Sequence, residues 1–226
     1  MINICGTEFD LEHPASIYVN CDCMIGMKKF PDKYFDLAVV DPPYGIGASE
    51  MTMGKGTKKQ WSKGKHWDDF APKKDYFNEL FRVSKQQIIF GGNYFELPKV
   101  RSWLVWDKGL YGKTSFADCE MIWTNINTVA RIIQCRYDGF IGADKDGRIH
   151  PTQKPIKLYE WILTRYAKEG YIILDTHVGS ASSLIACRNT NHKFVGFELD
   201  EYYYKLSKER LDRELAQMNL FDFMGG

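Results

Sequence analysis

Three short apolar runs in this chain each end at an acidic residue. The runs are FDLAVV before Asp41, YIIL before Asp175 and FVGF before Glu198. Continuous apolar runs of this length, separated by amphipathic segments, are typical of parallel strands that are buried on both faces. Ligands bind beyond the carboxyl ends of such strands, so the acidic residues found there are candidates for a site. Asp22, which follows the run SIYVN, is a fourth candidate.

The hydrophobic periodicity predicts alternating strands and helices. Strands are predicted over Ser16–Asn20, Phe35–Val40, Gln87–Phe90, Ser102–Trp106, Glu120–Thr124, Tyr171–Leu174 and Phe194–Phe197. Helices are predicted over Cys23–Phe30, Asp75–Ser84, Asn93–Lys99, Pro155–Ala167, Ala181–Arg188 and Glu201–Gln217, and residues 127–148 are predicted to be irregular. This alternation predicts an α/β fold in which helices cover both faces of a mostly parallel sheet.

The composition indicates one folded domain rather than a disordered or membrane-spanning chain. The chain has 226 residues, 44% of them hydrophobic, which is enough to build a sizeable core. No apolar run approaches the ~18 residues of a membrane helix, and the first residues lack the pattern of a secretory signal. A cytoplasmic protein is therefore expected. The six cysteines show no zinc-ligand spacing, so we expect reduced thiols and no metal site.

The basic charge is concentrated in one segment of an otherwise balanced chain. Residues 51–74 contain seven Lys and two Asp, whereas the whole chain has a net charge of +1. Lysines next to glycines and tryptophans suit contact with nucleic-acid phosphates. The lysines predicted to contact DNA are Lys55, Lys58, Lys59, Lys63 and Lys65. On charge alone, a solvated loop is the favoured interpretation.

The first chemical motif is Asp41-Pro42-Pro43-Tyr44, which directly follows an apolar strand. An exocyclic amino group on a nucleic-acid base is a weak nucleophile because its lone pair is delocalised into the ring. The Asp41 carboxylate and the Pro42 carbonyl can accept its two hydrogens and so free the lone pair. Tyr44 can stack on the base, which contributes about 1–3 kcal/mol. A proline-rich turn with a surface tyrosine is the alternative.

The second motif is the turn DTHVGSASS, which begins at Asp175 and is followed by Glu198 after the next strand. A strand, a glycine turn and a helix allow a ligand to approach the backbone, and an acid about 20 residues further on can accept ribose hydroxyls. The position two after Gly179 is Ala181, so the pyrophosphate-binding pattern G-x-G-x-x-G is absent. A nucleoside without diphosphate favours S-adenosylmethionine over a nicotinamide dinucleotide.

Together, these motifs resemble those of the D-P-P-Y amino-methyltransferases of DNA. The chain carries VVDPPYGIG first, then HPTQKP (His150–Pro155), then LDTHVGSAS and FELDEYY. This circularly permuted order resembles the β group of that family, and the resemblance covers residues 16–47 and 149–204. Between them, only WDK (Trp106–Lys108) and EMIW (Glu120–Trp123) are similar to the family. The resemblance implies a Rossmann-like, seven-stranded, S-adenosylmethionine-dependent methyltransferase fold.

The resemblance also assigns site residues. The catalytic residues it implies are Asp41, Pro42, Pro43 and Tyr44. The cofactor-binding residues it implies are Asp22, Asp41, His150, Thr152, Gln153, Lys154, Asp175, His177, Gly179, Ser180, Glu198 and Leu199. Asp22 is expected at the adenine, Glu198 at the ribose, and Asp175 with the following turn at the methionine. This chain has His177 where the family usually has Phe, and Ala181 in place of a second Gly.

The implied function is methyl transfer from S-adenosylmethionine to a base flipped out of double-stranded DNA. Asp before Pro-Pro favours adenine N6, and N4-cytosine is an alternative. The whole chain is expected to be one methyltransferase domain of the restriction-modification type. Residues 46–74 and 107–148 are expected to contact DNA, and residues 218–226 form a tail.

The partners and competing functions remain open at this point. Gln217–Phe221 (QMNLF) resembles a sliding-clamp peptide, although an apolar helix end is the favoured interpretation. A homodimer is a further candidate assembly. The alternatives to DNA methylation are an RNA methyltransferase, a non-catalytic DNA-binding module and a nicotinamide dehydrogenase. The intact Asp41–Tyr44 motif disfavours the second of these, and the missing G-x-G-x-x-G disfavours the third.

Overall fold

The computed structural model describes residues 1–46, 71–112, 117–136 and 148–224, with side chains described up to residue 216. Within these residues, the main sheet has eight strands in the order β3-β10-β9-β4-β5-β7-β6-β8. The strands are β3 (Ile17–Asn20), β4 (Phe35–Val40), β5 (Ser84–Phe90), β6 (Trp103–Asp107), β7 (Cys119–Thr124), β8 (Arg131–Gln134), β9 (Ile172–Asp175) and β10 (Lys193–Glu198). Strands β3, β10, β9, β4 and β5 are parallel, whereas β7 is antiparallel to both of its neighbours. The predicted mostly parallel α/β sheet is confirmed, with eight strands rather than seven.

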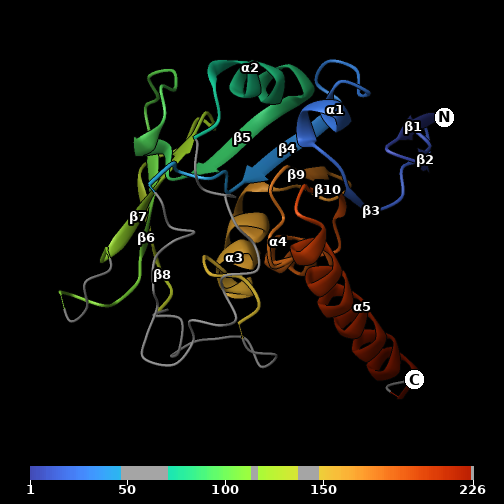
Figure 1. Ribbon diagram of the computed structural model, residues 1–226. Coiled ribbons are helices and arrows are strands. Elements are labelled where there is room, and N and C mark those ends of the chain that lie inside the picture. The colour runs from blue at the N-terminus through green and yellow to red at the C-terminus, as the bar shows by residue number, and fades with distance from the viewer. Residues whose placement is uncertain (47–70, 113–116, 137–147, 225–226) are drawn as a thin grey trace.

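Helices cover both faces of the parallel part of the sheet (Figure 1). One face carries α1 (Cys23–Met27) and α2 (Lys74–Val83), and the other carries α3 (Ile156–Tyr166), α4 (Ser182–Asn189) and α5 (Glu201–Met224). The C-terminal part of α5 extends away from the sheet (Figure 1). Among the described residues, no helix is both long enough and apolar enough to cross a membrane.

The strand β4 shows why residues 37–40 are all apolar. Leu37 and Val39 belong to the core cluster that contains α3 and α4, whereas Ala38 and Val40 belong to the cluster that contains α1 and α2. Successive side chains of a strand point to opposite faces, and both faces here are covered, so residues 37–40 must all be apolar. Asp36, near the start of the strand, is only half-buried and pairs with the Lys85 ammonium. The strand ends at Asp41, and the two prolines that follow cannot continue the ladder.

Three features of the fold differ from the expectations. Residues 127–148 were expected to be irregular, but they contain β8, which pairs in parallel with β6 at the edge of the sheet. The chain also begins with a hairpin of β1 (Ile2–Ile4) and β2 (Thr7–Phe9). The helix predicted over Asn93–Lys99 is a single 3-10 turn at Gly92–Tyr94, because Pro98 cannot donate a helical hydrogen bond.

The expectation that all cysteines are reduced is wrong for two of them. The structure joins Cys5 in the β1–β2 turn to Cys21 after β3 by a disulfide, with their Cα atoms 6.0 Å apart. The two residues are 16 positions apart in the sequence, and their spacing gave no indication that the hairpin folds back onto the end of β3. Cys23 stays a free thiol.

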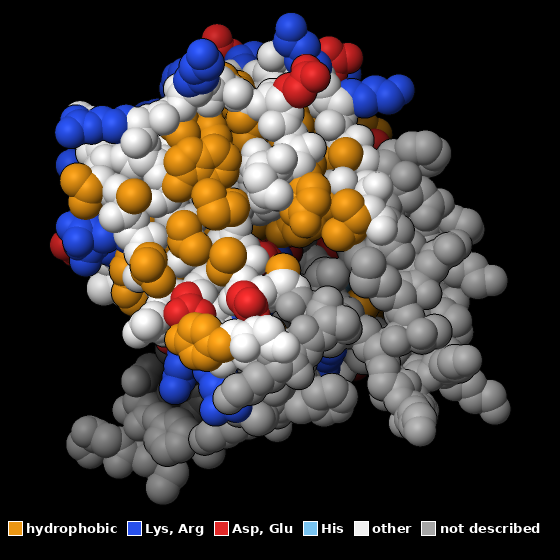
Figure 2. Space-filling view, turned by 90° about the vertical axis from the view of Figure 1, so that its left-hand side faces the viewer, with side chains coloured by type: hydrophobic (Ala, Val, Ile, Leu, Met, Phe, Trp, Pro, Cys, Tyr) orange, Lys and Arg blue, Asp and Glu red, His pale blue; other side chains and the backbone are white. Residues whose placement is uncertain are grey.

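The face of the molecule that carries β6, β7 and β8 exposes hydrophobic side chains between basic ones (Figure 2). Ile132 on β8 and Val129 just before it are more than half exposed. The predicted DNA-contacting lysines Lys55, Lys58, Lys59, Lys63 and Lys65 lie outside the described residues. Gln217–Phe221 lies in α5, in the part whose side chains are not described.

Candidate active site

The carboxyl ends of β4, β9 and β10 meet at one edge of the sheet, and a pocket opens there. Its lining residues are Asp41, Pro42, Pro43, Tyr44, Glu120, His150, Thr152, Gln153, Lys154, Tyr159, His177, Val178, Gly179, Ser180, Glu198 and Tyr203. The pocket joins the D-P-P-Y loop to the turn after β9, although more than 130 residues separate them in the sequence. The structure therefore brings together the two motifs that were identified separately.

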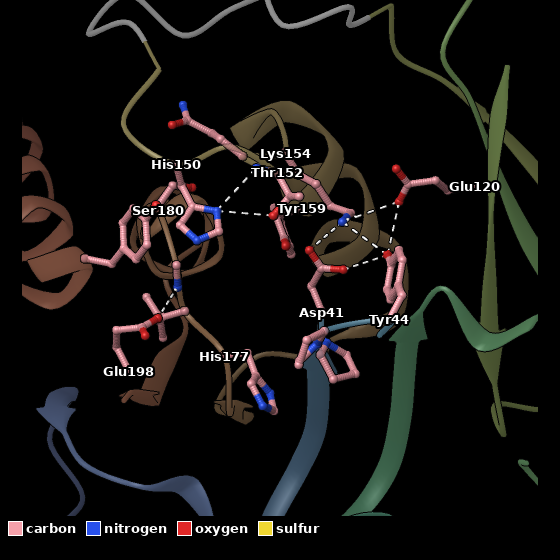
Figure 3. A pocket seen from close by; sticks show the side chains of 16 residues that line it. Asp41, Tyr44, Glu120, His150, Thr152, Lys154, Tyr159, His177, Ser180 and Glu198 are labelled. Atoms are coloured by element: carbon pink, nitrogen blue, oxygen red, sulfur yellow. Dashed lines mark hydrogen bonds and ion pairs between the residues drawn. The ribbon is translucent and has the colours of Figure 1, made fainter. Parts of the chain in front are cut away.

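Asp41 lies in a network of polar side chains inside this pocket (Figure 3). The Tyr44 hydroxyl donates to Asp41 Oδ1 at 2.8 Å, and Lys154 Nζ donates to Asp41 Oδ2. The Lys154 side chain is 4% exposed. Lys154 was predicted to bind the cofactor, whereas its ammonium group lies on the candidate catalytic carboxylate.

Glu120 and Lys108 complete the network and were not predicted as site residues. Glu120 lies 3.4 Å from Lys154 Nζ and 2.8 Å from Lys108 Nζ, on different carboxylate oxygens. Glu120 is near the start of β7, which runs antiparallel to its neighbours. The start of an antiparallel strand lies at the same edge of the sheet as the ends of its parallel neighbours. The acidic residues predicted from the sequence follow the ends of strands, whereas Glu120 lies at the start of one, so it was missed.

The buried charges of this network shift one another's pKa values. Burial raises the pKa of Asp41, and the Lys154 ammonium offsets only part of this rise. Burial would also raise the pKa of Glu120, but Lys154 and Lys108 prevail and lower it. Burial would lower the pKa of Lys154, but the two carboxylates prevail and raise it. Lys154 is therefore a cation held between two anions.

The Tyr44 ring is held in place by residues that follow β5. Tyr94 stacks on Tyr44, with ring centroids 4.8 Å apart and planes 14° apart, and Phe95 meets the ring edge-on at 6.0 Å. Gly91 has a φ of +64°, and a Cβ there would lie 2.3 Å from the Tyr44 ring. Only glycine meets both requirements, which are a left-handed backbone and space for the ring. Neither Tyr94 nor Gly91 was predicted as part of the site.

The turn after β9 is held by two carboxylates. Glu198 Oε2 accepts from the Gly179 amide at 2.8 Å, and Glu198 Oε1 accepts from the Asp200 amide at 2.9 Å. Asp175 lies behind the pocket lining, where it accepts from the His177 amide at 3.0 Å and from the Ser183 hydroxyl. Burial raises the pKa of both Asp175 and Glu198 to about 7.

The HPTQKP segment forms the opposite wall of the pocket. His150 Nδ1 accepts from the Thr152 amide at 3.3 Å, and the His150 ring packs on Tyr203 with a centroid distance of 4.3 Å. Gln153 Oε1 accepts from the Ile149 amide at 2.9 Å, which fixes the bend before α3. Burial lowers the pKa of His150 to about 3, so the imidazole is neutral at physiological pH. Tyr203 was not predicted.

Three predicted cofactor-binding residues lie outside the pocket lining: Asp175, which lies behind it, Asp22 and Leu199. Asp22 caps the N-terminus of α1 by accepting from the Met24 amide at 2.7 Å. Leu199 is 71% exposed. Their predicted cofactor contacts stay predictions, as do those of the lining residues. Within the described part of the chain, no group of three or more His, Cys, Asp or Glu side chains could hold a metal ion.

Comparison with known proteins identifies the family. A family model described as DNA methylase (N6/N4 type) matches residues 99–209. The type II methyltransferase M2.LlaDCHI of Lactococcus lactis subsp. cremoris is 38% identical over an alignment of 248 positions, which covers 89% of this chain and 91% of that protein. The type II methyltransferase M.HpaI of Haemophilus parainfluenzae is 37% identical over 79 residues, which cover 35% of this chain and only 25% of that enzyme.

Two solved structures share the fold. The M1.HpyAVI–SAM complex has a TM-score of 0.54 at 18% identity, over 86% of this chain and 98% of that one. The cytosine-N4-specific PvuII DNA methyltransferase has a TM-score of 0.55 at 12% identity, over 88% of this chain and 91% of that one. With the permuted motif order and a pocket that joins both motifs, the 38% identity to M2.LlaDCHI over 89% of this chain shows that the chain belongs to the N6/N4 family of DNA methyltransferases.

Proposed function

We propose that this protein transfers a methyl group from S-adenosylmethionine to the N6 amino group of an adenine flipped out of double-stranded DNA. One observation carries the proposal most strongly. Asp41 and the Gly179–Ser180 turn line the same pocket, so a methyl donor on the turn and an amino group on Asp41 can meet. Holding two reactants in register in this way can supply ~7–11 kcal/mol of the barrier reduction.

The pocket residues suit a nucleoside that carries an amino-acid end. A carboxylate has about four lone-pair sites, and Glu198 uses two of them on backbone amides, so two remain for ribose hydroxyls. The ionised form of Asp175 can attract the cationic methionine end. His150 and Tyr203 supply an aromatic wall. When bound there, S-adenosylmethionine supplies an electrophilic methyl group.

Asp41, Pro42 and Tyr44 act on the target base. The Asp41 carboxylate and the Pro42 carbonyl accept the two amino hydrogens, so that the nitrogen lone pair points at the methyl carbon. A nitrogen–carbon bond forms as the carbon–sulfur bond breaks. The electron pair of the broken carbon–sulfur bond stays on sulfur. The methylated amino group then carries one proton too many, which Asp41 accepts and passes to solvent. Tyr44 stacks on the base, and Tyr94, which stacks on Tyr44, supports its ring.

The choice of adenine rests on Asp rather than Ser before Pro-Pro, and cytosine N4 is the second candidate because the PvuII enzyme is named as cytosine-N4-specific. Labelled S-adenosylmethionine offered to DNA and RNA side by side tests both points. We expect label only in DNA, recovered as N6-methyladenine after digestion to nucleosides. N4-methylcytosine would refute the adenine assignment, and label confined to RNA would refute the DNA assignment.

The lysine-rich segment 51–74 is proposed to hold DNA phosphates. Substituting Lys55, Lys58, Lys59, Lys63 and Lys65 by Gln should weaken DNA binding and flatten its salt dependence. Each lysine–phosphate pair that the substitutions remove reduces the slope of log K against log salt by about 0.9. Binding to a duplex is measured between low and physiological salt concentrations. If the variant with all five substitutions had an unchanged salt slope, these lysines would not contact DNA phosphates.

Affinity for S-adenosylmethionine should rise with pH, because Glu198 accepts hydroxyl hydrogens best when it is ionised. Burial raises the pKa of Glu198 to about 7, so the protonated form prevails below neutral pH and the carboxylate prevails above it. Below the pKa, each group that must ionise changes the affinity by about tenfold per pH unit. Calorimetric titration at pH values on both sides of neutral measures the dependence.

In Glu198→Gln, the slope of log affinity against pH should fall by one, because one ionisable group is removed. The slope that remains comes from Asp175, whose pKa is also raised to about 7. Glu201→Gln is the matched control, because Glu201 is exposed and pairs with Lys205 outside the pocket. It should leave the slope unchanged. An identical slope in Glu198→Gln and in the unsubstituted protein would show that Glu198 does not meet the cofactor.

The remaining expectations stay proposals. They are the single methyltransferase domain with DNA contacts from residues 46–74 and 107–148, the clamp contact through Gln217–Phe221, the homodimer, the restriction-modification role and the cytoplasmic location.

A further inference from the structure

Four charged side chains of alternating sign form a row from β6 to the D-P-P-Y loop. The order is Lys108, Glu120, Lys154, Asp41, and the neighbours in the row are in contact. The members come from four segments: the end of β6, the start of β7, the HPTQKP segment and the loop after β4. Their side chains are between 4% and 19% exposed, so the charges interact where solvent screens them little.

Lys154 is shared between two carboxylates. Its Nζ contacts Asp41 Oδ2 and lies 3.4 Å from Glu120 Oε2. It also lies 4.8 Å from the centroid of the Phe90 ring and 5.7 Å from that of Tyr44, so aromatic rings restrict its movement. A small displacement is enough to move the ammonium from one carboxylate to the other.

Both oxygens of Asp41 already have donors. Oδ1 accepts from the Tyr44 hydroxyl, and Oδ2 accepts from Lys154. Each oxygen can accept a second hydrogen bond, so an amino group of a base can share this carboxylate with the two donors, but the Lys154 ammonium, as the charged donor, draws most on its negative charge. Lys154 has a second acceptor in Glu120, so its ammonium stays paired when it withdraws, while Asp41 keeps the Tyr44 hydroxyl and gains the amino hydrogen.

We propose that Lys154 is a positioning residue that binds Asp41 until the target base enters, and that Glu120 then receives the Lys154 ammonium and frees Asp41 Oδ2 for the amino hydrogen. This inference rests on the proposed function and deepens it. Glu120 thus decides how readily Asp41 becomes available, without touching the base. Lys108 keeps Glu120 paired in both arrangements.

The two partners act on Asp41 with opposite signs. Lys154 favours the ionised carboxylate, whereas Glu120 disfavours it. Among the described residues, the other titratable groups that interact with Asp41 are Tyr44 in its own loop, Tyr76 on α2, Tyr159 on α3 and Asp175 on β9. The three tyrosines are neutral at physiological pH, since burial raises all their pKa values further. Asp175 is the remaining acid, and substitutions of Lys154 or Glu120 leave it in place.

The test compares Lys154→Met with Glu120→Gln. Selective ¹³C labelling of aspartate and NMR titration give the pKa of Asp41, and single-turnover methylation of a mapped duplex gives the rate against pH. Lys154→Met should raise the pKa of Asp41 and move the acid limb of the rate profile to higher pH. Glu120→Gln should move both to lower pH. It should also lower the alkaline plateau by about tenfold, which corresponds to one pKa unit of interaction, because Lys154 then has a neutral amide oxygen in place of its second carboxylate.

Lys205→Met is the matched control, because Lys205 pairs with Glu201 on exposed α5 and should leave both measurements unchanged. Shifts of the same sign in the two variants, or an unchanged plateau in Glu120→Gln, would overturn the proposal. The NMR titration does not depend on methylation. A protein without methylating activity that still shows opposite shifts would refute the proposed function, and the coupling between the three residues would stand.

Discussion

Asp41→Asn should methylate DNA about 10³-fold more slowly than the unsubstituted protein, since positioned groups that take part in proton transfer contribute typically 10²–10⁴-fold. Asparagine keeps the shape of the side chain and its contact with the Tyr44 hydroxyl. It cannot carry the negative charge that draws the amino hydrogens away from the base, and it loses the ion pair with Lys154. Single-turnover rates with saturating cofactor isolate the transfer step.

The cofactor should bind Asp41→Asn within about twofold of normal, because Glu198 and the Gly179 turn are untouched. Asp212→Asn is the control for loss of a carboxylate, since Asp212 is exposed on α5 and pairs only with Lys208 among the contacts described. If Asp41→Asn methylated DNA as fast as the unsubstituted protein, Asp41 would have no part in the reaction. If Asp41→Asn lost both cofactor binding and methylation, Asp41 would instead belong to the cofactor site.

Gly91→Ala should reduce methylation about 10²-fold, which is the expected cost of misplacing a reactive group by about 1 Å. The new Cβ would lie 2.3 Å from Cε1 of Tyr44, so the ring must move. A displaced ring gives up its stacking on Tyr94 and its hydrogen bond to Asp41. The base then loses its stacking partner, and Asp41 loses the donor that orients it. Rates are measured with saturating DNA and cofactor.

Gly170→Ala separates this effect from backbone strain. Gly170 has a φ of +81°, and nothing lies within 4 Å of a Cβ placed there. Both variants should lose about 1–2 kcal/mol of stability as the cost of a left-handed backbone for an L-residue, and Gly91→Ala adds to this the cost of displacing the Tyr44 ring. Only Gly91→Ala should lose activity. Equal activity in the two variants would show that the position of Tyr44 does not matter for transfer.

The parallel core was predictable because its signal is local. The strands β4, β9 and β10 each contain a short apolar run, and α3 has an amphipathic period, so these four elements appear near their expected positions. Asp41, Asp175 and Glu198 follow these strands directly. Their arrangement at one edge follows from parallel pairing alone.

The missed residues belong to segments whose positions depend on tertiary packing. Glu120 joins the site only because β7 runs antiparallel between β5 and β6. Tyr94 joins it because a tight turn after β5 folds back over Tyr44. The short edge strand β8 is mostly exposed and lacks an apolar run, so its pairing with β6 left no pattern to detect. The position of Lys154 beside Asp41 could not be inferred from the segment HPTQKP. That segment indicates a bend before a helix, but it does not indicate which side chains Lys154 contacts.

Modified-base sequencing of a bacterial host that lacks DNA methylation tests the central claim most directly. The host expresses either the unsubstituted protein or Asp41→Asn at the same level. We predict N6-methyladenine at every copy of one short sequence with the unsubstituted protein, and unmodified DNA with the variant. A genome without modified bases, or one that the variant modifies equally, would contradict the claim that Asp41 and the Gly179 turn form one methyl-transfer site.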